Sequence, residues 1–210
     1  PTDASGQPLD ATPIPVRSRH ARLFFLVNLL LGDGLYPDFT QPATAGFPLP
    51  IWRLLALLGS GLAGPALRDD PLWPLLDRLA DELPTGADCA FARDWPIPPA
   101  RPQRAEATAA APAIRPRTLR HARPQGFTRW LAAYRQSARQ RLAAALDLPP
   151  TLLGRAFIQE DSAALIWVSA AEIVVVQPLD EHPVAWRLAG LDRDPGFLPS
   201  AGRSLRFIFS

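Results

Sequence analysis

Two aspartates near the C-terminal end of the sequence have a spacing that could support chemistry. Asp192 and Asp194 stand on either side of Arg193. Carboxylates so close together can act as a general acid and base or bind a hard metal ion. A calcium loop needs several more oxygen ligands at fixed offsets, however, and residues 195–200 add only one hydroxyl group. The Asp-Pro-Gly that begins at Asp194 is instead a strong turn signature, because proline presets φ and glycine accepts a positive φ. The pattern therefore favours a turn over a catalytic or metal-binding loop.

The histidines and the cysteine give little support for a metal site. His20, His121 and His182 stand far apart, and no two of them have the His-x-His or His-x-x-x-His spacing of a local metal site. A zinc site would need all three to converge from distant segments. The single cysteine, Cys89, excludes an internal disulfide and a cysteine-cluster zinc site. We therefore expect no metal and no other cofactor.

Nucleophilic catalysis also lacks a local signature. Ser60 lies in LGSGLAG, which lacks the strand before the serine and the helix after it that a hydrolase nucleophile needs. The same glycines do not form a phosphate-binding loop, because no Lys-Ser or Lys-Thr follows them. A hydrolase of unfamiliar type would require a cleft that gathers residues such as His20, His182, Asp192 and Asp194. The sequence favours a protein that is not an enzyme.

The composition indicates a globular chain with many rigid breaks. Of its 210 residues, 48% are hydrophobic, and the mean hydropathy is +0.01. This is enough apolar material for one ordinary domain or two small ones. The 25 prolines, about twice the usual proportion, predict frequent turns. All 22 basic side chains are arginine, yet the net charge is only +2, so no strong field covers the whole molecule.

Two apolar runs raise the question of a membrane. Residues 23–31 are far shorter than the roughly 20 apolar residues that span a bilayer, and residues 50–67 are interrupted by Arg53 and Pro65. We expect the first run to be a buried helix and predict no membrane span. A peripheral association remains an alternative, in which the apolar N-terminal helices would lie on a membrane beside the basic residues Arg17, Arg19 and Arg22.

Proline and glycine divide the first half of the sequence into short helices. Residues 1–18 are polar and broken by proline, which predicts an extended arm. Residues 19–95 are predicted to form a helical unit with helices over 19–31, near 50–59 and over 68–83. The second helix is expected to end at its glycines, Gly59 and Gly61. In the third helix we expect Asp69 or Asp70 as N-cap and Pro71 at the first helical position.

Residues 96–126 have the composition of a linker. They contain seven prolines, many alanines and too few bulky apolar residues to build a core. Their charge comes from one acid, Glu106, and from six arginines: Arg101, Arg104, Arg115, Arg117, Arg120 and Arg123. This segment could bind nucleic acid, but it has no aromatic residue on which a base could stack. We favour a solvated tether and do not expect nucleic acid as a partner.

The last part of the sequence, residues 127–210, changes from helix to strand. A long helix is predicted over 127–148, with Thr128 as its cap, and β-branched and aromatic residues predict strands over 163–170 and 172–179. Residues 203–210 alternate well enough for a final strand.

Residues 180–191 fit either a strand or a short helix, and we favour the helix. Its apolar side would carry Val184, Leu188 and Leu191. The fold class expected for the whole chain is α+β, with a small, mainly antiparallel sheet. Whether the helical and β-rich units share one core is left open.

The C-terminal segment resembles a known group of sequences. Residues 174–209, VVVQPLDEHPVAWRLAGLDRDPGFLPSAGRSLRFIF, are similar to the end of an accessory protein family encoded in gene clusters of phage-tail-like extracellular contractile injection systems. The run from Arg187 to Gly196 matches the family pattern without a gap, and Phe197 stands where tryptophan is usual. Gly202, Arg203, Phe207 and Phe209 also match. RLFFLVNLLL and LPIWRLLALL resemble the leading helices of the family.

The resemblance implies a setting in a particle with a sheath, a tube and a baseplate. We expect a structural or assembly accessory that acts through contacts with other proteins of the particle, and no small-molecule substrate. It would be cytoplasmic or associated with the particle. An exposed terminal strand can add to a partner's sheet. The partner-binding residues that we expect are Arg187, Asp192, Arg193, Asp194, Phe197, Arg203 and Arg206.

Overall fold

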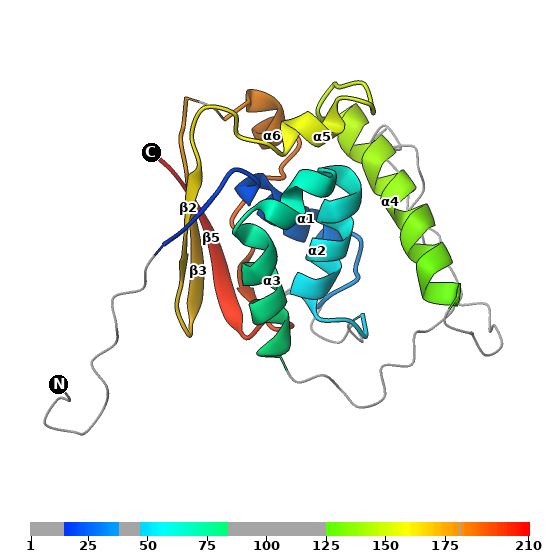
Figure 1. Ribbon diagram of the computed structural model, residues 1–210, viewed down its shortest axis with the longest axis horizontal. Coiled ribbons are helices and arrows are strands. Elements are labelled where there is room, and N and C mark those ends of the chain that lie inside the picture. Colours follow the sequence, from blue (N-terminus) through cyan, green and yellow to red (C-terminus); the bar gives the residue numbers. More distant parts are fainter. Residues whose placement is uncertain (1–14, 38–46, 84–124, 181) are drawn as a thin grey trace, which may run out of the picture.

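The computed structural model describes residues 15–37, 47–83, 125–180 and 182–210. In these residues the chain forms helices and one mixed sheet, which confirms the α+β class (Figure 1). The predicted linker and most of the predicted arm lie outside the described residues. Cys89 and His121 lie outside them as well.

The sheet has the strand order β1-β2-β3-β5-β4, and its described strands number five. Three of its four pairings are antiparallel, and the central pairing of β3 with β5 is parallel. One strand comes from the end of the predicted arm, and the others come from the last 50 residues of the chain. The strands are β1 (Val16–Ser18), β2 (Ala164–Val168), β3 (Glu172–Gln177), β4 (Gly196–Leu198) and β5 (Arg203–Phe209).

Helices from the first half of the chain lie against one face of this sheet (Figure 1). That face is apolar because alternate residues of each strand point to it, as Ile173, Val175 and Leu205 do, and all three are fully buried. The elements of the first half are a 3₁₀ helix η1 (Ala21–Phe25), α1 (Leu26–Gly32), α2 (Ile51–Leu62), a 3₁₀ helix η2 (Pro65–Asp69) and α3 (Leu72–Asp81).

The two halves of the described chain share one hydrophobic core. Phe25 shows the connection most directly, since its ring lies 5.3 Å from that of Trp186 and 4.8 Å from that of Phe207. The run LFFLVNLLL is buried in this core, as its near-continuous apolar pattern predicts.

The second helix runs past both glycines that were expected to end it. A Cβ at Gly59 would lie 2.9 Å from Cδ1 of Leu23, and a Cβ at Gly61 would lie 2.7 Å from Cδ of Arg135. The glycines therefore allow α2 to pack closely against η1 and α4, and the prediction that they terminate the helix is wrong.

The long helix α4 (Gln125–Ala145) begins before Thr128, so Thr128 lies inside the helix and is not its cap. Polar contacts hold α4 to the end of α1. The hydroxyl of Tyr134 donates to Asp33 at 2.6 Å, and the guanidinium of Arg141 donates to both oxygens of the same carboxylate at 2.6 and 2.8 Å. Burial and the negative charge of Asp33 raise the pKa of Tyr134 far above its usual range, so this phenol stays protonated and donates.

Two short helices complete the fold, α5 (Leu153–Ala156) and α6 (Val184–Leu188). The helix alternative for residues 180–191 is therefore confirmed. Of its expected apolar side, Leu191 is buried, but Val184 and Leu188 are 68% and 83% exposed. The prediction is wrong for these two residues, and Trp186 is buried instead. The indole fills the core, and the two aliphatic side chains, one helical turn apart, face solvent.

Candidate functional site: the corner between α6 and β4

The corner that joins α6 to β4 is built around the carboxylate of Asp192. Its Oδ2 lies 3.0 Å from Nε2 of His182 and 3.2 Å from Nε of Arg187. The side chain of Asp192 is only 5% exposed and that of Arg187 is 62% exposed. The carboxylate therefore ties the start and the end of α6 together from inside, while the arginine closes the pair from the solvent side.

A side chain of helix α1 holds this corner in place by hydrogen bonds to its backbone. The side-chain amide of Asn28 donates to the carbonyl oxygens of Leu191 at 2.7 Å and of Arg193 at 2.8 Å. Asn28 is thus the polar residue inside the apolar N-terminal run that holds the C-terminal turn.

The backbone at Gly190 is also adapted to the turn. Its φ is +68°, a conformation that favours glycine, and a Cβ there would lie 3.3 Å from Nε of Arg193.

The chain turns at Leu191 and Asp192, just before Asp-Pro-Gly, and Gly196 has the positive φ, +71°, that this motif predicts. Asp194 also has a structural role. Oδ1 of Asp194 accepts the backbone N–H of Phe207 at 2.6 Å, which ties the turn to β5. The sequence prediction did not include β4, which follows at once and pairs antiparallel with β5. The aspartates of the opening motif thus bond to different groups and do not form a carboxylate pair.

The remaining predicted partner-binding residues lie along β4 and β5. Arg203 donates to Glu82 at 2.5 Å and to the carbonyl of Ala170 at 3.3 Å, and Arg206 donates to Glu172 at 3.3 Å. Phe197 lies on the edge strand β4 and is 40% exposed. The structure therefore brings Arg187 and Asp192 together, while Arg203 and Arg206 lie farther along the sheet and contribute contacts within the chain.

His182 is held neutral in this corner. Its side chain is 3% exposed, and its ring lies 4.3 Å from that of Phe209 and 5.8 Å from that of Phe25. Burial lowers the pKa of His182 below its usual value, and this outweighs the opposing effect of the hydrogen bond to Asp192. Because an ionised carboxylate can only accept, Nε2 carries the proton, and Nδ1 is buried without a partner.

A second histidine–aspartate pair lies where β1 meets α3. Nδ1 of His20 is 3.1 Å from Oδ2 of Asp70, and the hydroxyl of Ser18 donates to Oδ1 of the same carboxylate at 2.6 Å. The backbone N–H groups of Arg19 and Leu72 also donate to it, at 3.0 and 2.8 Å. Burial acts to raise the pKa of Asp70, but these four hydrogen bonds outweigh burial and leave the pKa below its usual value.

Neither pair has the arrangement of a nucleophile and its base. Ser18 donates to the aspartate and not to the imidazole, and Nε2 of His20 is buried without a partner. His20 and His182 form separate pairs, so no described cleft gathers the residues that a hydrolase would require. Among the described residues, no group of three or more histidine, cysteine, aspartate or glutamate side chains could hold a metal ion.

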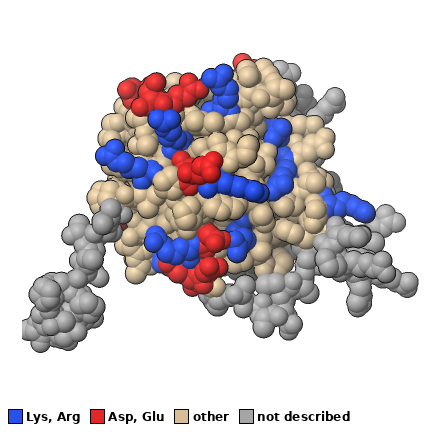
Figure 2. Space-filling model, viewed as in Figure 1, with Lys and Arg blue, Asp and Glu red and all other residues tan. Residues whose placement is uncertain are grey.

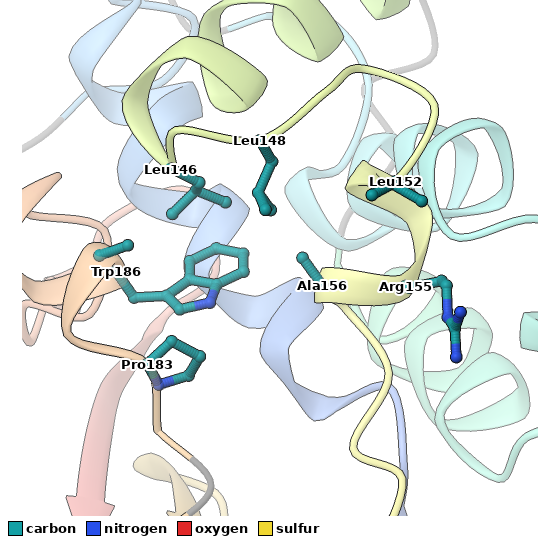
Figure 3. Close-up of a pocket in the computed structure, with 8 residues that line it drawn as sticks. Leu146, Leu148, Leu152, Arg155, Ala156, Pro183 and Trp186 are labelled. Carbon is teal, nitrogen blue, oxygen red and sulfur yellow. The ribbon is translucent and has the colours of Figure 1, made fainter.

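An apolar groove of about 390 Å³ opens beside the corner (Figure 3). It lies between the end of α4, helix α5 and helix α6, which come together at the top of Figure 1. The side chains that form it include Leu146, Leu148, Leu152, Ala156, Ala185 and Trp186. Sequence reasoning missed this site, because its lining comes from three segments that share no spacing or motif.

The charges near these features are mixed in sign. On the face of the molecule shown in Figure 2, basic and acidic side chains lie in small interspersed groups. The groove has one charged residue in its lining, Arg155, which is paired with Glu160 at 2.9 Å. Both side chains are more than 60% exposed, at 73% and 63%.

Comparisons with known proteins give no relative. No protein-family model, no curated protein and no solved structure matches this chain. In the part of the chain that the structure describes, no helix has the length and the apolar character needed to cross a membrane. Many apolar side chains of η1, α1 and α2, such as Phe24, Leu26 and Leu54, are fully buried in the core and do not lie at the surface, where a peripheral membrane contact would need them.

Proposed function

We propose that this protein is a non-enzymatic assembly accessory of a contractile, phage-tail-like injection particle and that it acts through protein–protein contacts. The proposal starts from the resemblance of residues 174–209 to an accessory family of such particles. Contacts in the matched run separate into two kinds. Asp192 and Asp194 bond inward and shape the corner, whereas Leu188 points away from it.

The exposure of Leu188 is the observation on which the proposal mainly rests. At 83%, it has the greatest exposure among the large apolar side chains of the described residues, and Val184 lies one turn before it at 68%. Isolated apolar side chains at a surface need no explanation, but two on one side of a five-residue helix beside an apolar groove are typical of a contact surface. If the matched run served packing alone, Leu188 would be buried.

The experiment is affinity purification of the tagged full chain from its native host, followed by identification of the bound proteins. We expect sheath, tube or baseplate proteins to co-purify, and we expect deletion of the gene to reduce the yield of assembled particles. Leu188→Asp should abolish co-purification. Leu179→Asp is the matched control, since Leu179 is 55% exposed but lies outside α6.

The proposal fails if no particle protein co-purifies and the deletion leaves particle assembly unchanged. Equal co-purification by Leu188→Asp and Leu179→Asp would instead show that the contact surface does not include α6.

A further inference from the structure

The groove between α4, α5 and α6 contains an unsatisfied hydrogen-bond donor. Trp186 is 99% buried, since only 1% of its surface is exposed, and the rings of Phe25 and Phe157 lie 5.3 and 5.4 Å from its ring. None of the hydrogen bonds within the described part of the chain uses its indole N–H. Buried tryptophans usually find an acceptor for this group.

The indole nitrogen faces the groove. It is not one of the described polar atoms that are both sealed from solvent and without a partner, so it keeps a small contact with solvent. Because the indole is otherwise enclosed by the core, the groove that it lines is the opening available to this contact. Figure 3 shows the indole at the centre of the groove, below Leu146 and Leu148, with its nitrogen on the side of Ala156 and Pro183.

We propose that this groove binds an amphipathic helix of a partner protein, which inserts apolar side chains against Trp186 and places an acidic residue near Arg155. A volume of about 390 Å³ accommodates large apolar side chains. The lining consists of side chains on helices and on the turns beside them, and none of the lining residues belongs to a described strand with which a peptide could pair. A helix that inserts side chains fits such a groove, whereas an added strand does not.

The charge of the groove lining indicates which polar group the partner helix carries. Arg155 is the one charged residue of the described lining, so the complementary group is a carboxylate. Its present partner, Glu160, is held in an exposed pair, and such pairs contribute little free energy. An incoming carboxylate can therefore replace Glu160, and an oxygen of the same helix can accept the indole N–H of Trp186.

The rim of the groove favours a protein over a small ligand. Leu152 is 47% exposed at the groove, and Val184 lies between Pro183 and Ala185, which both line it. A small apolar carboxylate would fill the groove but leave these side chains in water. A helix that lies across the rim would cover them. This inference rests on the groove alone and does not require a contractile particle.

The test uses the full chain and a fluorescent model helix of roughly 18 residues, with leucine at i, i+3, i+4 and i+7 and with glutamate and alanine elsewhere. We expect saturable binding, and we expect the peptide to shift the indole N–H resonance of Trp186 in a ¹⁵N–¹H spectrum. Leu152→Asp should weaken binding about tenfold or more, while Leu179→Asp should leave it unchanged. Arg155→Gln should weaken it by about threefold.

Three results would overturn the proposal. The first is no saturable binding of the peptide, and the second is equal peptide affinity in the Leu152→Asp and Leu179→Asp variants. The third uses laurate, a small apolar carboxylate, as a second probe: laurate shifts the indole N–H resonance of Trp186 and the peptide does not. The last result would identify a site for small apolar carboxylates. Both substituted leucines are at the surface, so the variants should keep the fold, and circular dichroism confirms this before binding is measured. If no particle protein co-purifies with the wild-type chain while the peptide still binds it, the proposed function is rejected and this inference stands.

Discussion

Two histidine–aspartate pairs of nearly equal length, 3.1 and 3.0 Å, stand at opposite ends of the sequence and have different surroundings. The carboxylate of Asp70 receives four hydrogen bonds, from Ser18, Arg19, His20 and Leu72. The carboxylate of Asp192 receives two, from His182 and Arg187. The N-terminal pair joins β1 to the start of α3, whereas the C-terminal pair braces α6.

The difference shows that two pairs of the same residue types can differ in how much they contribute to stability. The Asp70 side chain is 7% exposed, and its donors include the backbone N–H groups of Arg19 and Leu72, which cannot turn away. Loss of the carboxylate would therefore leave four donors without an acceptor in a buried site. The site of Asp192 is covered partly by Arg187, which is 62% exposed and can turn into solvent. We therefore expect the first pair to contribute mainly to stability and the second to the shape of a surface.

Removal of the Asp70 carboxylate should have the largest effect. Asp70→Ala leaves the four donors unsatisfied in a buried site, and we expect a loss of about 3–5 kcal/mol in the free energy of unfolding. Urea denaturation followed by circular dichroism measures it. The neighbouring residue provides the control, because Asp69 is exposed and Asp69→Ala should change stability by less than about 0.5 kcal/mol. Similar losses in the two variants would contradict the special role of Asp70.

Removal of the Asp192 carboxylate should cost less. Asp192→Ala leaves the buried Nε2–H of His182 without an acceptor, whereas the guanidinium of Arg187 can bond to water instead. We therefore expect a loss of about 2–3 kcal/mol in the free energy of unfolding. The same denaturation experiment applies, with exposed Asp161→Ala as the control. A loss as large as that of Asp70→Ala would remove the distinction between the two pairs.

The two pairs should also differ in the pH range over which they contribute to stability. The lowered pKa of His182 means that the unfolded state binds a proton more readily than the folded state does. The stability that this histidine contributes is therefore fully present above its unfolded pKa of about 6.5 and is lost as the pH falls below that value. Denaturation at pH 7.5 and 5.5 should show a smaller loss in His182→Gln than in the wild-type protein.

Asp70 affects stability in a lower pH range than His182 does. Its lowered pKa contributes stability that is present above the unfolded value of about 3.9 and is lost only as the pH falls below it. If His182→Gln and the wild-type protein lost equal stability between pH 7.5 and 5.5, the pH dependence assigned to the C-terminal pair would be wrong.

The smallest effect is expected from Arg187. Arg187→Ala removes an exposed partner and its contact over the ring of Phe209, and should lower the free energy of unfolding by about 0.5–1 kcal/mol. Differential scanning calorimetry at low and high salt measures it, since the pair should weaken with added salt. A loss of more than about 2 kcal/mol would show that Arg187 is a structural member of the pair, as His182 is.

Local patterns predicted most elements of this protein. The proline and glycine positions, the β-branched runs and the apolar spacing identified the third helix, the long helix and the strands near 163–170, 172–179 and 203–210 to within a few residues. The predictions failed where a neighbour decided the outcome. Gly59 and Gly61 stay inside α2 because η1 and α4 pack against them, and Trp186 replaces Val184 and Leu188 as the buried residue of α6.

The candidate sites divide in the same way. The positive φ of Gly196 in the Asp-Pro-Gly motif could be predicted because it depends on adjacent residues. The pairing of His20 with Asp70, 50 residues apart, could not, and neither could the groove lined by residues from three segments. Such contacts depend on how β1, α1 and α6 come together in space, which no spacing along the chain encodes.

By itself, the sequence determined the α+β class, the positive φ of Gly196 and the burial of the N-terminal apolar run, because backbone preference and hydrophobic pattern act over a few residues. Only the tertiary structure decided that the aspartates of the opening motif bond to different groups, that Asn28 holds the corner, and that Leu188 faces solvent. A hydrogen bond or a contact between distant segments requires both partners at one place, and packing of the whole core determines that place.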